Sequence, residues 1–344
     1  MSPSAAHHAG RPGSPSHQDA EATPAIRVEG LRKSFGGLEA VRGVTFSVAP
    51  GEIFAFLGPN GAGKSTCINM LCTLAVPTAG RAWVSGRDVL REAGAVRERI
   101  GLVFQEQTLD AQLTANENLR FHAVLYGVPR GQVEPRMQRV LAMVGLSDRR
   151  GDLVSTFSGG MIRRLEIARG LLHAPEVLFL DEPTVGLDPQ TRARIWADIR
   201  RLRGEEGVTV FFSTHYMDEA EYADRVGIID HGQLVAVDTP AALKSAVGRD
   251  AVHLQTADDT AALSDLASAG IEASATLEGL VAFVDDGPTD LPRVLAAIGP
   301  PVKSIQVRRP TMDDVFLHFT GRELRDETVR GAYSPMRRAL ARRR

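Results

Sequence analysis

The feature that most constrains the fold of this chain is a glycine-rich loop that joins an apolar run to a helical pattern. The loop reads Gly58-Pro59-Asn60-Gly61-Ala62-Gly63-Lys64-Ser65, which fits the pattern G-x-x-x-x-G-K-[ST]. Residues 52–57 before it form a compact apolar strand pattern, and residues 67–74 after it continue as a helix. This order of strand, loop and helix predicts an α/β fold.

The chemistry expected of this lysine loop (residues 58–65) is the binding of a nucleoside triphosphate. Glycines let backbone N–H groups converge on phosphate oxygens without Cβ clashes, and the N-terminus of the following helix favours an anion. Lys64 offers a point charge to the β- and γ-phosphates, and the Ser65 hydroxyl suits Mg²⁺. GTPases, kinases and helicases share this motif, so the loop alone leaves the class of protein open.

A second feature is a pair of acids at the end of an apolar strand pattern. Residues 177–180 read Val-Leu-Phe-Leu and are followed by Asp181 and Glu182. Ligands of α/β proteins bind at the carboxyl ends of the strands. We therefore expect Asp181 to hold Mg²⁺, directly or through water, and Glu182 to polarise the attacking water as a base. Taken alone, the pair could be solvated acids at a strand end.

A third feature is the serine–glycine loop, Ser158-Gly159-Gly160, which opens the helical pattern of residues 161–172. Two glycines at a helix start expose N–H groups and make a second anion site. One chain has no use for two separate triphosphate cradles of this kind. We infer that the serine–glycine loop closes over nucleotide bound to another protomer.

Together these features resemble the ABC-type ATPases over about residues 26–245. The lysine loop, Gln105, the serine–glycine loop, Asp181-Glu182, Gly186-Leu187-Asp188 and His215 occur in the order and spacing of that family. The resemblance implies a P-loop ATPase core of α/β class, with antiparallel β and α-helical subdomains. It implies ATP and Mg²⁺ as cofactors and a homodimer of nucleotide-binding subunits.

The resemblance also implies roles for individual residues. Phe35 would stack on adenine, Gln105 would sense the metal and water, Asp188 would lie at the dimer interface, and His215 would contact the γ-phosphate. The implied catalytic residues are Glu182, His215 and Gln105, and the implied metal-site residues are Ser65, Gln105 and Asp181. The implied nucleotide-binding residues are Phe35, Gly58, Pro59, Asn60, Gly61, Ala62, Gly63, Lys64, Ser65, Thr66, Ser158, Gly159, Gly160 and Asp188. Taken alone, Phe35 would be a core aromatic residue.

One position departs from the family's usual spelling, Leu-Ser-Gly-Gly-Gln. This chain has Phe157 before the serine–glycine loop and Met161 after it, and Met161 cannot hydrogen-bond as glutamine does. The spelling resembles the branch that includes daunorubicin-resistance (Drr-type) ATP-binding subunits of drug exporters. Residues 310–317, Pro-Thr-Met-Asp-Asp-Val-Phe-Leu, resemble the ending of those proteins.

The branch implies a motor that energises efflux of a hydrophobic drug or antibiotic through a separate membrane permease. The chain would then sit at the cell membrane as a peripheral subunit on the cytoplasmic side, with residues 106–110 contacting the permease. Export of a lipid or polysaccharide stays open, as does an importer motor, which a neighbouring gene for a solute-binding protein would indicate. A soluble ABC-type ATPase acting on ribosome or DNA fits less well, because the chain has one lysine loop and no heptad array.

Changes in composition divide the chain into four regions. Residues 1–24 have almost no large apolar side chains, so we expect a disordered tail. Residues 26–247 would form the ATPase domain and residues 248–320 a small C-terminal α+β domain. Residues 321–344 form an arginine-rich basic tail, either solvated or contacting a phosphate-bearing membrane surface or an acidic partner.

Hydrophobic patterns predict the individual elements. The expected strands are 26–31, 38–48, 52–57, 177–180, 208–212, 226–230, 234–237, 252–256, 271–277, 281–284 and 302–307, with turns at 36–37, 42–43 and 231–232. The expected helices outside the middle region are 191–203, 259–269 and 289–298. Residues 97–170 are expected to be mostly helical, with Thr114 and Glu117 as a capping box.

Composition limits the classes of partner that the chain is expected to bind. The formal net charge of -2 gives no sign of the basic face that nucleic acid requires, so we expect no nucleic-acid partner. No apolar stretch approaches the ~20 residues that span a bilayer, so we expect any work at a membrane to pass through a partner. Cys67 and Cys72 lie five residues apart without metal-type spacing, and we interpret both as reduced core thiols.

Overall fold

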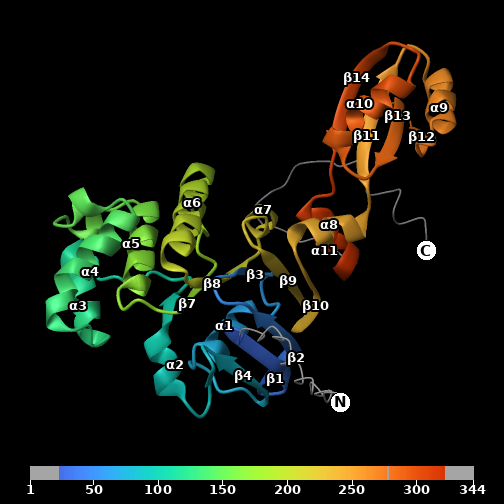
Figure 1. The fold of residues 1–344 in the computed structure, drawn as a ribbon. Coiled ribbons are helices and arrows are strands. Elements are labelled where there is room, and N and C mark those ends of the chain that lie inside the picture. Colours follow the sequence, from blue (N-terminus) through green and yellow to red (C-terminus); the bar gives the residue numbers. More distant parts are fainter. Residues whose placement is uncertain (1–22, 277–278, 322–344) are drawn as a thin grey trace, which may run out of the picture.

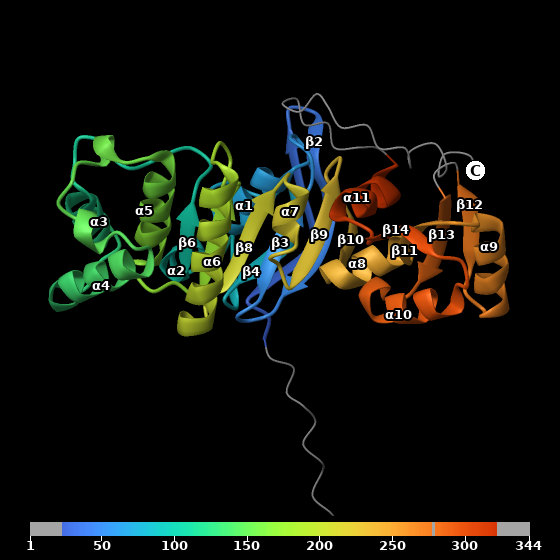
Figure 2. The same ribbon diagram turned by 90° about the horizontal axis from the view of Figure 1, so that it is seen from above.

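The computed structural model describes residues 23–276 and 279–321, so most of both predicted tails lies outside the described residues. Figure 2 shows three parts in a row. A helical part, made of α3 (Ala115–Leu125), α4 (Arg130–Met143) and α5 (Gly159–Leu171), lies at one end. Two sheets occupy the middle, and a third sheet with its own helices lies at the other end.

The central sheet has six strands in the order β10-β9-β3-β8-β7-β6. Their bounds are β10 Gln233–Asp238, β9 Arg225–Asp230, β3 Ile53–Leu57, β8 Thr209–Thr214, β7 Val177–Asp181 and β6 Ile100–Val103. The five strands from β9 to β6 run parallel, and β10 pairs with β9 in the antiparallel sense. Every residue of β3, β7 and β8 is buried, as uninterrupted apolar runs predict for strands covered on both faces.

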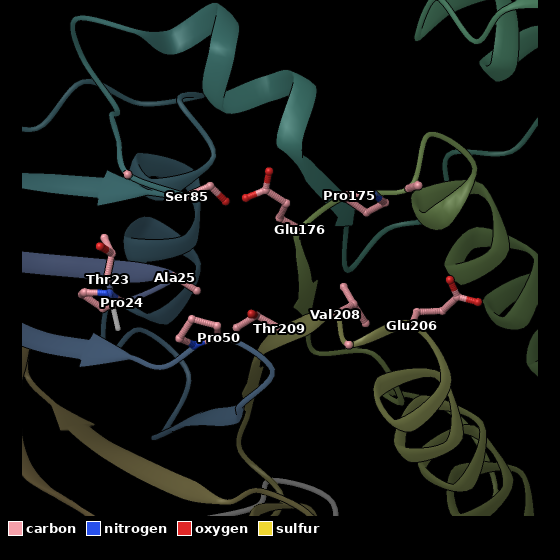
Figure 3. Close-up of a pocket in the computed structure, with 13 residues that line it drawn as sticks. Thr23, Pro24, Ala25, Pro50, Ser85, Pro175, Glu176, Glu206, Val208 and Thr209 are labelled. Atoms are coloured by element: carbon pink, nitrogen blue, oxygen red, sulfur yellow. The ribbon is translucent and has the colours of Figure 1, made fainter. Parts of the chain in front are cut away.

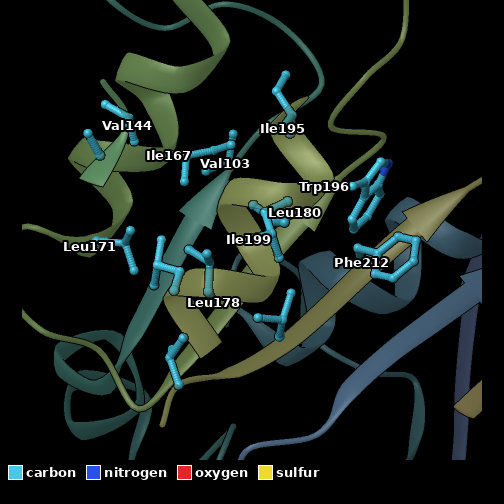
Figure 4. Close-up of a cluster of buried hydrophobic side chains, with 14 of the residues drawn as sticks. Val103, Val144, Ile167, Leu171, Leu178, Leu180, Ile195, Trp196, Ile199 and Phe212 are labelled. Atoms are coloured by element: carbon cyan, nitrogen blue, oxygen red, sulfur yellow. The ribbon is translucent and has the colours of Figure 1, made fainter. Parts of the chain in front are cut away.

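Alternate residues of β7 show how the two faces are covered. Leu178 and Leu180 belong to a hydrophobic cluster shared with α5 and with α6 (Pro189–Glu206), as Figure 4 shows. Val177 and Phe179 belong to a second cluster, shared with α1 (Lys64–Leu71) and the neighbouring antiparallel sheet. The period of two along the strand thus places α1 on one face and α5 and α6 on the other.

The antiparallel sheet has the strand order β2-β1-β4-β5. Its strands are β1 Ile26–Phe35, β2 Leu38–Val48, β4 Ala79–Val84 and β5 Arg87–Asp88. The predicted turn at Arg42-Gly43 is wrong, because β2 continues through it as an irregularity in its pairing with β1. Gly43 has a φ of 82°, which gives the extra residue its left-handed backbone without ending the strand.

The expectation that residues 97–170 are mostly helical holds for α3, α4 and α5 but is wrong at its start. There α2 (Ala93–Arg99) ends and β6 begins at once, with only four residues in the strand. Short 3₁₀ turns at Ser147–Arg149 and Val154–Thr156 connect α4 to α5. The capping box at α3 is confirmed, because Thr114 and Glu117 bond each other's backbone N–H.

The third sheet is antiparallel, with the order β12-β13-β11-β14. Its elements are β11 Asp250–Thr256, α9 Asp259–Ser268, β12 Ala273–Thr276, β13 Gly279–Val284, α10 Gly287–Ala297 and β14 Val302–Arg308. Helix α8 (Pro240–Val247) precedes this module. Helix α11 (Met312–Thr320) follows it and returns to α8 and to α7 (Met217–Ala220), where Val315 and Phe316 join the hydrophobic cluster of the central sheet (Figure 1).

Two expectations from composition can be checked in the described part of the chain. Cys67 and Cys72 are free and buried, and burial raises the pKa of Cys67 to about 12. Among the described helices, none combines the length and the hydropathy that a membrane span needs.

Candidate nucleotide-binding and hydrolysis site

The lysine loop connects the carboxyl end of β3 to α1, and its glycines are required by close packing. A Cβ atom at Gly58 would lie 2.2 Å from the Ile229 carbonyl oxygen. A Cβ atom at Gly63 would lie 2.6 Å from the Ala40 carbonyl oxygen, and the φ of Gly63 is 104°. The loop therefore keeps its backbone against two strands, with the N–H groups at the start of α1 available to an anion.

Lys64 is almost completely buried at the start of α1, with 4% of its surface exposed. Its Nζ donates to the carbonyl oxygens of Gly58 at 2.7 Å and Pro59 at 3.1 Å, which holds the side chain over the loop. Nζ also pairs with Glu182 Oε1 at 3.1 Å. Burial lowers the pKa of Lys64, against the attraction of Glu182 and Asp181. The loop thus carries one cation in contact with the acid of the neighbouring strand.

Asp181, the last residue of β7, offers oxygen ligands beside this loop. Its Oδ1 accepts hydrogen bonds from Ser65 Oγ at 3.1 Å and from Ser213 Oγ at 2.5 Å. A carboxylate and a hydroxyl of this kind fit Mg²⁺, which binds proteins through one or two oxygen ligands and takes the others from water and phosphate. Gln105, also predicted for the metal site, contacts Glu182, with its Nε2 3.4 Å from Glu182 Oε2.

Glu182 is the centre at which the predicted catalytic residues meet. Its Oε2 lies 3.3 Å from His215 Nδ1 and 3.4 Å from Gln105 Nε2, while Oε1 faces Lys64. Burial alone would raise the pKa of Glu182, but the hydrogen bond from His215 and the charge of Lys64 outweigh it and lower the pKa. The carboxylate is therefore held in its ionised form, the form that accepts a proton.

Two further residues position this centre, and the sequence alone did not single them out. The Ser213 hydroxyl accepts the backbone N–H of Glu182 at 3.0 Å and donates to Asp181, so it ties both acids to β8. The only signal for Ser213 was the change from apolar to polar residues after position 212. Arg163 contacts the backbone of both acids, and nothing in its sequence context indicated this.

The serine–glycine loop lies at the start of α5 and has no cation of its own. The Ser158 hydroxyl accepts the N–H of Met161 at 3.3 Å and so caps the helix, while Ser158 and Gly159 are exposed. In the described part of the chain no hydrogen bond or ion pair joins residues 158–160 to the lysine loop or to Glu182. The structure therefore keeps this predicted anion site apart from the first one.

The remaining predicted residues lie around these two loops. Asp188 is exposed and caps α6 by accepting the Thr191 N–H at 2.9 Å. A Cβ atom at Gly160 would lie 2.4 Å from Thr191 Cγ2, so the start of α6 packs against the serine–glycine loop. Phe35 ends β1 with 52% of its surface exposed, so it is not a core residue. Lys33 Nζ lies over the Phe35 ring, 4.8 Å from its centroid, in a cation–π contact.

A cavity of about 520 Å³ lies elsewhere, at the opposite end of the parallel strands (Figure 3). Its lining includes Glu176 and Thr209, which lie at the amino ends of β7 and β8. Lys64, Asp181 and Glu182 lie at the carboxyl ends of β3 and β7, where α/β sheets bind their ligands. The cavity is therefore separate from the site described above.

Comparison with known proteins agrees with this geometry. Residues 41–185 match the family model described as ABC transporter. The chain is 38% identical over 311 residues to the linearmycin resistance ATP-binding protein LnrL of Bacillus subtilis (strain 168), covering 88% of this chain and 100% of that protein. It is 39% identical to the daunorubicin/doxorubicin resistance ATP-binding protein DrrA of Streptomyces peucetius, covering 90% of this chain and 96% of that one.

A solved structure extends the agreement to the fold. The ATP-binding cassette MJ0796, solved as a dimer in a post-hydrolysis state bound to ADP and Pi, superposes with a TM-score of 0.57 and 26% identity. The superposition covers 62% of this chain and 98% of that chain. The P-loop core predicted from the sequence is therefore confirmed. The chain belongs to the ABC transporter family, in which it is an ATP-hydrolysing subunit.

Proposed function

We propose that this protein energises the export of a hydrophobic drug or antibiotic through a separate membrane permease. The observation that carries the hydrolytic part is the convergence of Lys64, Gln105 and His215 on the Glu182 carboxylate. A drug as the transported molecule is supported by the relatives. They are named for resistance to linearmycin and daunorubicin, and this chain matches them over most of their length.

The contacts of Lys64 suggest how ATP prepares the site. The triphosphate would bind the N–H groups of the lysine loop, and Lys64 would turn from Glu182 to the phosphates, because both acceptors compete for one ammonium group. Glu182 would then be free to accept a proton from the attacking water. His215 and Gln105, which already touch the same carboxylate, would orient that water and the γ-phosphate.

Mg²⁺ would be held by Ser65 and Asp181, with Gln105 near it. When bound, Mg²⁺ neutralises charge that develops on the phosphate oxygens. Ser213 would keep Asp181 oriented, because its hydroxyl donates to the oxygen that also accepts from Ser65. The aromatic ring of Phe35, exposed at the end of β1, would stack on the adenine.

Two copies of the chain would complete each site. Ser158 and Gly159 are exposed at the start of a helix, and residues 158–160 include no cation, so the loop fits a nucleotide held by the lysine loop of a second copy. Asp188 and the start of α6 lie beside it and would form part of the same interface. The dimeric relative MJ0796 supports this assembly.

A permease contact at residues 106–110 is supported by helix α3, which bonds this segment near its N-terminal end. Phe121, Val124 and Leu125 of that helix are each more than 60% exposed. Helix α3 is tied to the segment by Asn118, whose side chain accepts the N–H of Asp110 and donates to its carbonyl oxygen, both at 2.9 Å. An apolar surface beside a polar segment fits a membrane protein's cytoplasmic loop, so the subunit would be peripheral on the cytoplasmic side.

The test is drug efflux by the chain together with a six-span membrane protein, the partner that this proposal expects to be encoded beside it. Cells that express both should expel daunorubicin, measured by its fluorescence, and should resist it. Lys64→Ala with the same permease should stop efflux, because removing the loop's cation weakens ATP binding by about 10²-fold. Efflux that persists in Lys64→Ala would contradict the proposal. If the pair has normal ATPase activity and no drug efflux but transfers a labelled lipid or oligosaccharide, that molecule is the cargo and the drug is not.

A further inference from the structure

The backbone of Glu182 is held in an unusual conformation. Its φ is 44°, in the left-handed region that non-glycine residues rarely adopt, and it is 7% exposed. Such a conformation costs on the order of 1–3 kcal/mol and persists only where surrounding groups fix it. The Ser213 hydroxyl fixes the N–H of Glu182, so the carbonyl side needs another partner.

That partner is Arg163 of α5, five residues after the start of the serine–glycine loop. All five N–H donors of its buried guanidinium are used. Nη2 donates to the carbonyl oxygens of Asp181 at 3.0 Å and Glu182 at 3.1 Å, and Nε donates to that of Pro183 at 2.6 Å. One side chain thus holds three successive carbonyl groups of the segment that carries both acids.

The two remaining donors reach the segment that carries Gln105. Nη1 of Arg163 donates to the carbonyl oxygen of Phe104 and to Glu166 Oε2, the latter at 2.9 Å. Glu166 is completely buried, and its Oε1 accepts the N–H of Thr108 at 2.8 Å. Residues on both sides of Gln105 are therefore tied to the same buried pair.

We propose that Arg163, oriented by Glu166, is a positioning residue for the hydrolytic centre. The pair joins three elements: α5, which begins with the loop that faces a second copy; the backbone of Glu182; and the segment around Gln105. Any shift of α5 must move or break these bonds, so the base and Gln105 take their places according to where α5 lies. This inference rests on the role proposed above for Glu182.

A purely structural pair would show different behaviour. Removing one partner of a buried ion pair is strongly destabilising, because it leaves an uncompensated buried charge. A pair kept only for packing would therefore affect unfolding and nucleotide affinity as much as turnover. A positioning pair should affect kcat, because misplacing a reacting group by about 1 Å costs on the order of 10²-fold in rate.

The test variant is Arg163→Lys, which keeps the positive charge beside Glu166 but replaces the fork by a point charge that cannot reach three carbonyl groups. We expect kcat for ATP to fall about 10²-fold, with KM within about threefold of the wild-type value. Arg164→Lys is the matched control. Arg164 is the next residue of α5, its guanidinium donates to the Val144 carbonyl oxygen at 2.7 Å, and its replacement should leave kcat unchanged.

Hydrogen exchange supplies a readout independent of turnover. Amides of residues 104–108 and of Asp181 and Glu182 should exchange faster in Arg163→Lys, while those of β3 should not. Wild-type kcat in Arg163→Lys, or an equal loss of kcat and ATP affinity, would overturn the proposal. If Arg163→Lys does not fold, Glu166→Gln decides in the same way, because it keeps the side-chain shape and removes the charge that orients Arg163.

Glu182→Gln, measured in parallel, separates this proposal from the function on which it rests. If Glu182→Gln keeps wild-type turnover, the assignment of the base is wrong. If Glu182→Gln is slow while Arg163→Lys is normal in both turnover and exchange, only the positioning role is wrong.

Discussion

The molecule carries two glycine-containing loops that each open a helix, and they differ in what accompanies them. The lysine loop lies beside a buried cation and two acids on adjacent strands. In the serine–glycine loop Ser158 and Gly159 are exposed and Gly160 is buried, and among the described residues the hydrogen bonds of Ser158 stay within its own helix α5. The first loop therefore has charged groups suited to phosphate and metal beside it, whereas residues 158–160 carry none. This difference supports our proposal that one loop binds nucleotide and the other closes over it.

The two loops also differ in what holds them to the central sheet. Behind the lysine loop, α1 packs on aromatic and aliphatic side chains, including stacked rings of Phe54 and Phe211. Behind the serine–glycine loop, α5 is joined to the sheet partly by buried charged groups, Arg163, Glu166 and Arg169. Close packing resists movement in every direction, but hydrogen bonds depend on direction. The second loop is therefore the one whose position can be coupled to chemistry.

The largest expected effect comes from the acid beside the first loop. Glu182→Gln should lower the ATPase rate by about 10²–10⁴-fold, because the amide cannot accept the proton. ATP binding should remain, since the lysine loop is intact, and a closed dimer should accumulate. ATPase assays and size-exclusion chromatography with and without ATP measure both results. A variant that stays monomeric with ATP and turns over rapidly would contradict the assignment of the base.

A smaller loss is expected from a charge placed in the second loop. Gly159→Glu should leave ATP binding by the monomer unchanged but reduce ATP-dependent dimerisation and hydrolysis by roughly 10²-fold, because the added carboxylate repels a phosphate. Gly151→Glu is the control, since Gly151 precedes the same helix α5 and a Cβ atom added there would have no heavy atom within 4 Å. Equal losses in both variants, or a loss of ATP affinity in Gly159→Glu alone, would break the contrast between the two loops.

The smallest expected effect is on the acid stability of the helical part. Burial, and then the charge of Arg169, lower the pKa of His122 to about 4. The unfolded chain binds a proton below about pH 6.5 and the folded chain does not until about pH 4, so stability falls as the pH drops between these values. His122→Gln should recover on the order of 1 kcal/mol at pH 5.

The measurement is the urea midpoint of wild type and His122→Gln at pH 7.5 and pH 5. We expect the urea midpoint to fall less for His122→Gln than for wild type when the pH drops from 7.5 to 5. An identical loss of midpoint in both proteins would show that the helical part is not the acid-sensitive one.

The sequence was most informative where chemistry depends on residue type and spacing. The lysine loop and the acid pair stood out because each follows an apolar run, whereas His215 was implied only by the family resemblance. The strands β3, β7, β8 and β9 are confirmed at the predicted places. The four-residue strand β6 was missed because helical patterns surround it and a strand so short has little period of its own.

Contacts between distant segments could not be predicted. Ser213 meets Asp181 and Glu182 only because β8 pairs with β7, and Arg163 meets Glu182 only because α5 packs over the same strand end. The left-handed backbone of Glu182 also had no signal, because such a conformation in a non-glycine residue is set by its surroundings. Sequence reasoning likewise gave α11 to the small module, although its buried residues lie in the main cluster.

The return of α11 has a mechanical consequence for the C-terminal sheet. That sheet is connected to the ATPase domain at two points, through α8 before it and α11 after it. Near these connections Arg309, which follows β14, bonds Asp250 at 3.0 Å and Asp286 at 2.7 Å. The sheet is therefore arranged as an insertion between two helices, α8 and α11, and not as a simple C-terminal extension. A chain truncated after Val247 would lose Val315 and Phe316 from the hydrophobic cluster of the central sheet. A short linker that joins α8 directly to α11 would remove the C-terminal sheet and keep that cluster intact.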